Sequence, residues 1–288
     1  MTEAHGGYYV PHHASPWPIT GSVGLFLMLG GFAHLLHGGA PYVMILGAAL
    51  VMVMMFGWFR TVIKESQAGT YNDQVDMSFR WGMGWFIFSE VMFFGAFFGA
   101  LFYARMFSVP WLGGASNNVA THELLWPAFD ALWPTNGPGD VGGAYESMHA
   151  WGIPALNTVI LLSSGVTVTW AHWGLKKGNR QQLILGLLAT VALGFLFLGF
   201  QAYEYTEAYT KLNLTLGSGI YGTTFFMLTG FHGAHVTIGA IMLTVILLRS
   251  IKGHFTAEHH FAFEAAAWYW HFVDVVWLGL FIFVYWLA

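Results

Sequence analysis

The chain has 288 residues, of which 56% are hydrophobic and 18% aromatic but only 8% charged. A soluble domain carries about 25% charged residues, so this composition excludes a single soluble core and indicates that the bilayer is the solvent. The formal net charge is −4 with only 10 basic residues, which argues against nucleic acid as a partner. The absence of cysteine excludes disulfides, thiolate metal sites and thiol catalysis.

Hydropathy divides the chain into seven apolar segments, each long enough to cross a bilayer. We expect them at about 19–36, 41–59, 81–107, 151–173, 183–203, 217–248 and 261–287. Strand-like alternation of polar and apolar residues is missing, so the segments are expected to be helices and not the strands of a barrel. The sequence therefore predicts an all-α, polytopic protein with seven transmembrane helices in a single membrane domain, residues 1–288.

Lysine and arginine are distributed unevenly over the connections between these segments. The second, fourth and sixth connections hold eight of them, and the first, third and fifth hold two. They are Arg60, Lys64, Arg80, Lys176, Lys177, Arg180, Arg249 and Lys252, against Arg105 and Lys211. Because positive charge stays on the cytoplasmic side, the N-terminus is expected there and the C-terminus on the outer side. The one long connection, about 108–149, is then an outward loop packed on the surface.

One carboxyl group lies deep in the third segment. Glu90 follows Arg80 by ten residues and is surrounded in sequence by Phe88, Phe93 and Phe94. At about 1.5 Å of rise per residue it would lie about 15 Å into a hydrocarbon core about 30 Å thick. Desolvation at that depth favours the neutral, protonated carboxyl group. Glu90 is therefore a candidate functional or lipid-related residue, with a protonated helix-packing hydrogen bond as the alternative.

The last segment contains ionisable residues at helical spacing. His271 and Asp274 are three residues apart and His260 and Glu264 four apart, so each pair shares a helix face. An unpaired charge inside a membrane costs several kcal/mol, so such groups must be paired, neutral or functional. We interpret Glu264, His271 and Asp274 as structural polar residues that hydrogen-bond to each other or to other helices.

Histidines form two further groups. His232 and His235 share a face near the middle of the sixth segment, where they could join a metal site, although interhelical hydrogen bonding is the favoured, structural interpretation. Others gather at the expected cytoplasmic side: His12, His13, His254, His259 and His260. Histidines there could collect and pass protons, which makes His12, His13, His259 and His260 a candidate proton antenna, or they could be ordinary solvated residues.

Several long motifs together resemble one known family. They include SPWP at 15–18, WFRTVIKES at 58–66, FIFSEVMFFGAFF at 86–98, PALNTVILLSSGVTVTWAH at 154–172, QAYEY at 201–205, YGTTFF at 221–226, TGFHGAHVTIG at 229–239 and HHFAFEAAAWYWHFVDVVWL at 259–278. Over nearly its whole length the chain is similar to subunit III of the haem-copper cytochrome c oxidases.

The resemblance implies both a fold and a function. The first two helices, within 1–64, would splay from the other five, within 77–288, around a V-shaped cleft that holds phospholipids. The chain would be a core subunit without a cofactor of its own, in a complex that reduces O₂ to water and pumps protons. Its partners would be phospholipids and subunits I and II, which carry the haem and copper, and cytochrome c would meet it only through the complex. It would stabilise subunit I, support proton uptake and give O₂ access.

The resemblance also assigns lipid contacts to particular residues. Glu90 matches the family's carboxyl group in the cleft, and Trp58 and Arg60 match the cleft edge after the second segment. Basic positions that meet lipid headgroups at the end of the sixth segment are matched by Arg249, Lys252 and His254. No catalytic residue and no metal ligand is expected in this chain.

Two departures from the family's pattern concern the loops. Many relatives carry a histidine pair shortly after the second segment, whereas this chain reads QAGTYNDQ at 67–74. The outward loop is longer than in mitochondrial members, which favours a bacterial protein. We therefore expect a multi-pass protein of the bacterial inner (plasma) membrane, with a cytoplasmic N-terminus and a periplasmic C-terminus, and the mitochondrial inner membrane as the alternative.

Two other protein classes share some of these features. A di-iron membrane enzyme would need many histidine or carboxylate ligands at one level of the membrane. Here the histidine pairs lie at different depths: His34 with His37, His232 with His235, and His259 with His260. A membrane transporter could use Glu90 and Asp274, but the sequence shows no internal repeat and no proline-broken helices at mid-membrane.

Overall fold

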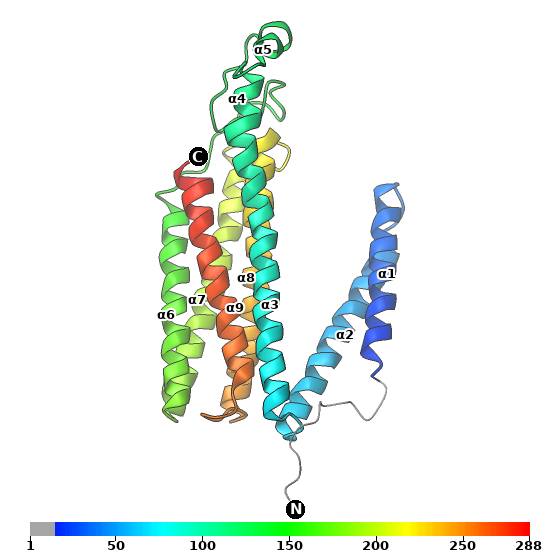
Figure 1. Cartoon of the computed structure of the whole chain (residues 1–288), viewed down its shortest axis with the longest axis vertical. Helices are drawn as coiled ribbons and strands as arrows, with labels where there is room; N and C mark the ends of the chain where they lie inside the picture. Colours follow the sequence, from blue (N-terminus) through cyan, green and yellow to red (C-terminus); the bar gives the residue numbers. More distant parts are fainter. Residues whose placement is uncertain (1–14) are drawn as a thin grey trace, which may run out of the picture. The chain divides into compact units, whose positions relative to one another are not determined.

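The computed structural model describes residues 15–288, which contain helices, turns and loops but no strand (Figure 1). Seven helices in this range are long and apolar enough to cross a membrane. They are α1 (Trp17–Leu36), α2 (Tyr42–Gln67), α3 (Asp73–Tyr103), α6 (Ile153–Lys176), α7 (Arg180–Thr210), α8 (Gly219–Ile251) and α9 (Phe261–Leu280), the last extended by the π-helical turn η2 (Phe281–Trp286). The predicted all-α fold with seven membrane-spanning helices is confirmed.

The third helix is longer at both ends than hydropathy predicts. It begins at Asp73, because Asn72 accepts a hydrogen bond from Val75 N at 2.9 Å and Arg80 pairs with Asp76 at 2.8 Å. Hydropathy averaged over a window does not detect this first turn, because its residues are polar. At the other end the helix continues through η1 (Ala104–Ser108) and α4 (Val109–Leu112), so the long connection expected at about 108–149 begins with helix. The loop also contains the short α5 (Val119–Leu125).

The chain forms two compact units, Met1–Trp81 and Gly82–Ala288, and α3 runs through the boundary between them. The expected single membrane domain stays a prediction. The same holds for the splayed arrangement around a lipid cleft.

In the first unit, α1 and α2 pack closely against each other because glycine lies at their contact. A Cβ atom at Gly47 would overlap the backbone of Met28, and one at Gly31 would overlap the backbone of Met44. The Trp17 indole N–H donates to Thr61 Oγ1 at 3.1 Å and joins the start of α1 to α2. Small residues thus allow the close helix approach that drives association in lipid.

In the second unit, α6 contacts α7, α7 contacts α8, α8 contacts α9, and α9 contacts α6 again, so these four helices form a closed ring. The fully buried Trp270 and Trp277 of α9 fill its interior. The indole N–H of Trp270 donates to Ser164 Oγ at 2.8 Å, and that of Trp277 donates to Thr158 Oγ1 at 2.9 Å. The last helix of the chain therefore supplies the centre of the bundle.

The packing of α1 on α2 predicts that alanine lowers stability at a glycine in the helix contact but not at a glycine outside it. Gly47→Ala forces the two helices apart and should destabilise the unit by about 1 to 3 kcal/mol. Gly30→Ala is the matched control, because a Cβ there meets nothing within 4 Å among the described residues. Thermal unfolding of the purified protein in one detergent should show a lower midpoint only for Gly47→Ala. Equal midpoints for both variants would contradict the close contact.

Candidate functional site

The carboxyl group of Glu90 on α3 has a partner on α8. His235 Nε2 lies 2.8 Å from Glu90 Oε2, and His235 Nδ1 lies 2.6 Å from the Phe231 carbonyl oxygen. Because a carbonyl oxygen only accepts, Nδ1 carries a proton. The Nε2–Oε2 contact then holds one further proton, either as a protonated Glu90 bound to neutral imidazole or as a carboxylate bound to imidazolium. In both forms the pair is neutral overall, and the contact joins two helices, as in the helix-packing hydrogen bond that the sequence left as the alternative for Glu90.

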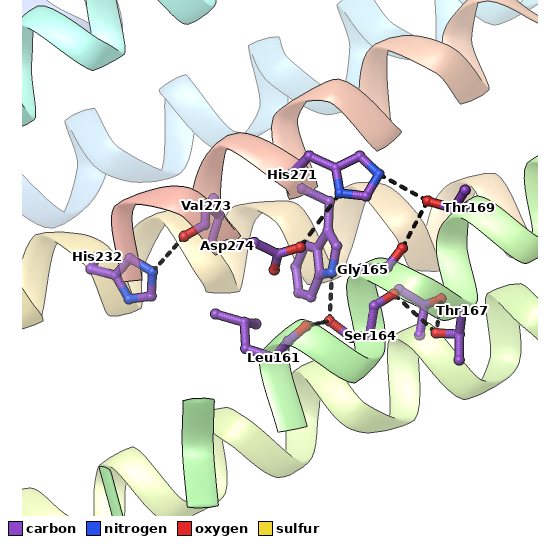
Figure 2. A network of polar contacts seen from close by, with 11 residues as sticks. Leu161, Ser164, Gly165, Thr167, Thr169, His232, His271, Val273 and Asp274 are labelled. Atoms are coloured by element: carbon purple, nitrogen blue, oxygen red, sulfur yellow. Dashed lines mark hydrogen bonds and ion pairs between the residues drawn. The ribbon is translucent and has the colours of Figure 1, made fainter. Parts of the chain in front are cut away.

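His232 faces a different neighbour from His235. It is fully buried, and its Nε2 donates to the Val273 carbonyl oxygen of α9 at 3.1 Å (Figure 2). The two histidines thus connect α8 to two different helices, α9 and α3. They do not converge on a shared metal site, and each makes an interhelical hydrogen bond of the kind favoured from the sequence.

His271 and Asp274 belong to a network between α9 and α6 (Figure 2). His271 Nδ1 lies 3.5 Å from Asp274 Oδ2, and His271 Nε2 lies 3.2 Å from Thr169 Oγ1. The Thr169 hydroxyl donates to the Gly165 carbonyl oxygen at 2.9 Å, so it accepts from His271 Nε2. A side chain at Gly165 would overlap the Asp274 carboxylate. The glycine on α6 is therefore what makes room for a carboxyl group on α9.

A third group brings together side chains from α6 and the start of α9. Glu264 Oε1 lies 3.1 Å from His260 Nε2 and 3.6 Å from His172 Nε2. The ligand atoms of these three residues all lie within 4.8 Å of one another, so the group could hold a divalent cation such as Zn²⁺. His260 is only 7% exposed, so it is not the ordinary solvated residue that the sequence left as one of two interpretations. The sequence analysis missed His172, whose only signal was its place at the same end of the membrane as His260.

A buried carboxyl group on α7 was also missed. Glu204 is fully buried and accepts a hydrogen bond from the Tyr285 hydroxyl at 2.6 Å. One turn earlier, Gln201 Nε2 donates to the Thr229 carbonyl oxygen at 2.9 Å. The hydropathy pattern places the end of this helix near residue 203, but α7 continues to Thr210. An acid that looked like part of a surface turn is therefore inside the bundle.

Cations gather at the C-terminal end of α8. Arg249 is only 8% exposed, and its guanidinium carbon lies 4.5 Å from the centre of the Phe255 ring. Arg180, from the start of α7, donates to the Ile251 carbonyl oxygen. The pKa of His254 is lowered from 6.5, first by desolvation and then by the positive charges of Arg249 and Lys252. At neutral pH, His254 therefore adds less positive charge than the arginine and the lysine.

The remaining candidate residues lie apart from these networks. Trp58 and Arg60 belong to the first unit and are exposed, with Trp58 stacked on Phe59 at 5.9 Å. His259 is exposed, and its backbone N–H donates to Thr256 Oγ1 at 3.0 Å. His12 and His13 lie outside the described residues.

The network between α6 and α9 predicts the effect of removing its carboxyl group. Asp274→Leu leaves His271 Nδ1 without its nearest partner in the bundle, which should cost about 1 to 3 kcal/mol. Thermal unfolding should show a lower midpoint for this variant. Asp274→Asn keeps an oxygen acceptor at the same place, so its unfolding midpoint should fall less than that of Asp274→Leu. A Leu variant as stable as the unchanged protein would show that the contact contributes nothing.

The pair on α3 and α8 predicts selective labelling. A hydrophobic carbodiimide attacks a protonated carboxyl group within lipid, so Glu90 should be modified in preference to the acids near the helix ends, Glu65, Asp73 and Asp76. His235→Phe removes the nitrogen that shares the proton and leaves the carboxyl group neutral in apolar surroundings, so labelling should rise. Mass spectrometry of the labelled peptides measures both effects. Labelling that is confined to the other acids, or that falls in His235→Phe, would contradict this arrangement.

The known proteins to which this chain is similar carry the same name. Residues 8–288 match the family described as cytochrome c oxidase subunit III. Cytochrome c oxidase subunit 3 of Squalus acanthias is 45% identical over 285 residues, which cover 99% of this chain and 98% of the relative. The protein of the same name from Equus asinus is 42% identical over 287 residues, 99% of each chain. Both relatives are from vertebrates, so they give no support to the expected bacterial source. The chain belongs to the cytochrome c oxidase subunit III family.

Proposed function

We propose that this chain is a core subunit without a redox centre in a membrane complex that reduces O₂ to water and pumps protons. The observation that carries the proposal is the family match over residues 8–288, supported by 45% identity to a relative of which 98% is covered. In this role the chain stabilises subunit I, also binds the complex that contains subunit II, and meets cytochrome c only through that complex. Haem and copper reside in the partner subunits.

The contacts of three histidines within the membrane-spanning helices support a structural and not a redox role. His232, His235 and His271 each have a partner on another helix: a backbone carbonyl, a carboxyl group and a hydroxyl group. With no cysteine, the chain cannot form a thiolate-bridged copper site. The family membership also opposes both alternatives, a transporter and a di-iron membrane enzyme.

Lipid binding is the second part of the proposal. The end of α8 presents Arg249 and Lys252 beside the membrane boundary, where cations can meet headgroup phosphates. The proposed lipid contacts also include Trp58, Arg60, Glu90 and His254. Aromatic and basic side chains of this kind are common where a protein surface meets lipid headgroups.

Proton uptake and O₂ access complete the proposed role. The pair of Glu90 and His235 can share a proton inside the membrane, and the exposed His259 could exchange protons with water.

The basic connections favour a cytoplasmic or matrix-side N-terminus, in the plasma membrane of a bacterium or the inner membrane of a mitochondrion.

The proposal is tested by purifying the chain from its native membrane. Haem-bearing partner chains should accompany it in constant proportion. The chain separated from them should hold no stoichiometric haem or copper in metal analysis, since it has no cysteine thiolate to bind copper. The assignment would be refuted if the chain purified without haem-bearing partners. One tightly held copper or iron per separated chain would also refute it.

The lipid contact predicts a further outcome. Replacing both Arg249 and Lys252 by Ala removes two cations at the end of α8 and should release bound anionic lipid, at about 1 kcal/mol per lost charge. The oxidase should then inactivate sooner during turnover. Lys176→Ala, an exposed cation at the end of α6, serves as the control. Unchanged lipid content by mass spectrometry in the double variant would show that Arg249 and Lys252 do not hold the lipid.

A further inference from the structure

Two neighbouring helices of the bundle, α6 and α9, share an outer face that is apolar except at Ser163 and at one level that holds Thr169 and His271. We call this the α6/α9 face. Its exposed apolar side chains are Val159, Val166, Trp170, Trp268, Val275 and Ile282. Among them lies His271, whose side chain is 46% exposed. Both nitrogens of His271 contact side chains of the bundle, yet about half of this side chain is exposed on the outer surface of a membrane-spanning helix.

The polar level lies well inside the membrane. His271 is ten residues from the start of α9 at Phe261, and Thr169 is seven residues from the end of α6 at Lys176. With about 1.5 Å of rise per residue, these positions lie roughly 10 to 15 Å from the helix ends. Lipid headgroups do not reach that depth, and acyl chains offer no hydrogen bond. A partly exposed imidazole there is expensive unless protein covers it.

The outer face of α7 provides a comparison within the same bundle. Between Leu183 and Ala202 every exposed residue of α7 is apolar or glycine, with Leu185, Leu188 and Phe195 about half exposed. That surface suits lipid chains alone. The α6/α9 face therefore differs from the outer face of α7, although α8 also exposes a polar residue, Thr237.

We propose that the α6/α9 face receives a membrane-spanning helix of a partner oxidase subunit, and that this helix places a side-chain hydroxyl or amide at the level of His271 and Thr169. The inference rests on the proposed function, because membership in an oxidase complex supplies the partner. The hydroxyl of Thr169 donates to Gly165 and accepts from His271, which leaves one lone pair of its oxygen free.

A hydroxyl or amide group on the partner fits this site as a hydrogen-bond donor. It donates to the free lone pair of Thr169 Oγ1, because the Nε2–H of His271 is already bonded to that oxygen. Trp170 and Trp268 are 42% and 38% exposed beside this level, and tryptophan is enriched at the centre of protein interfaces. Hydrogen bonds of this kind between small polar side chains join helices within membranes.

The absence of cysteine allows a direct test, because a single introduced thiol is the only reactive one in the chain. Val166→Cys and Val275→Cys place a photoreactive maleimide on the α6/α9 face of the intact complex in its native membrane. Leu188→Cys and Ala192→Cys, exposed on α7, are the matched controls. The first two should form adducts with one partner subunit in severalfold higher yield than the controls, which should label lipid.

A second variant tests the polar contact itself. Thr169→Val keeps the side-chain shape but removes the hydroxyl group, so less of the chain should remain in the complex after detergent washing, and Thr169→Ser should restore it. Lipid adducts from both faces, equal protein adducts from both faces, or unchanged retention of Thr169→Val would overturn the inference. In those cases the chain still purifies with haem-bearing partners, whereas failure of the proposed function removes the partners altogether.

Discussion

An ionisable side chain inside a membrane needs a partner within the protein, since lipid cannot provide one. This chain meets that requirement with contacts between helices. Glu90 joins α3 to α8 through His235, and the buried His232 joins α8 to α9. Each contact fixes the depth and the rotation of two helices relative to each other. Because lipid chains are as apolar as the hydrophobic side chains, these polar contacts add to the close packing that holds the helices in register.

The sequence predicts the helices well and their polar contacts only in part. The spans follow from hydropathy, and the pairing of His271 with Asp274 follows from their spacing of three residues. Contacts between distant segments leave no such periodic signal: Glu90 and His235 are 145 residues apart, and Thr169 and His271 are 102 apart. The resemblance to a known family supplied the function, which composition and spacing alone left open.

The residues that sequence analysis missed have a common cause. Glu204 and His172 lie close to the ends of apolar segments. Hydropathy averaged over a window predicts the end of a helix there and not a buried residue. The helices extend past these boundaries because their last turns are polar but still packed against neighbours, as the bond from Tyr285 to Glu204 shows. Burial is decided by the length of the adjacent helices, and that information is not local in sequence.

The position of the two buried tryptophans in the last helix bears on the order in which the bundle forms. A chain is made from its N-terminus, so α6, α7 and α8 are complete before Trp270 and Trp277 have been synthesised. Until then Ser164 and Thr158 lack the indole donors, and Gly194 and Gly239 border an unfilled space that Trp270 later occupies. Closure of the ring thus follows the synthesis of α6, α7 and α8, and termination of translation before α9 leaves an open bundle.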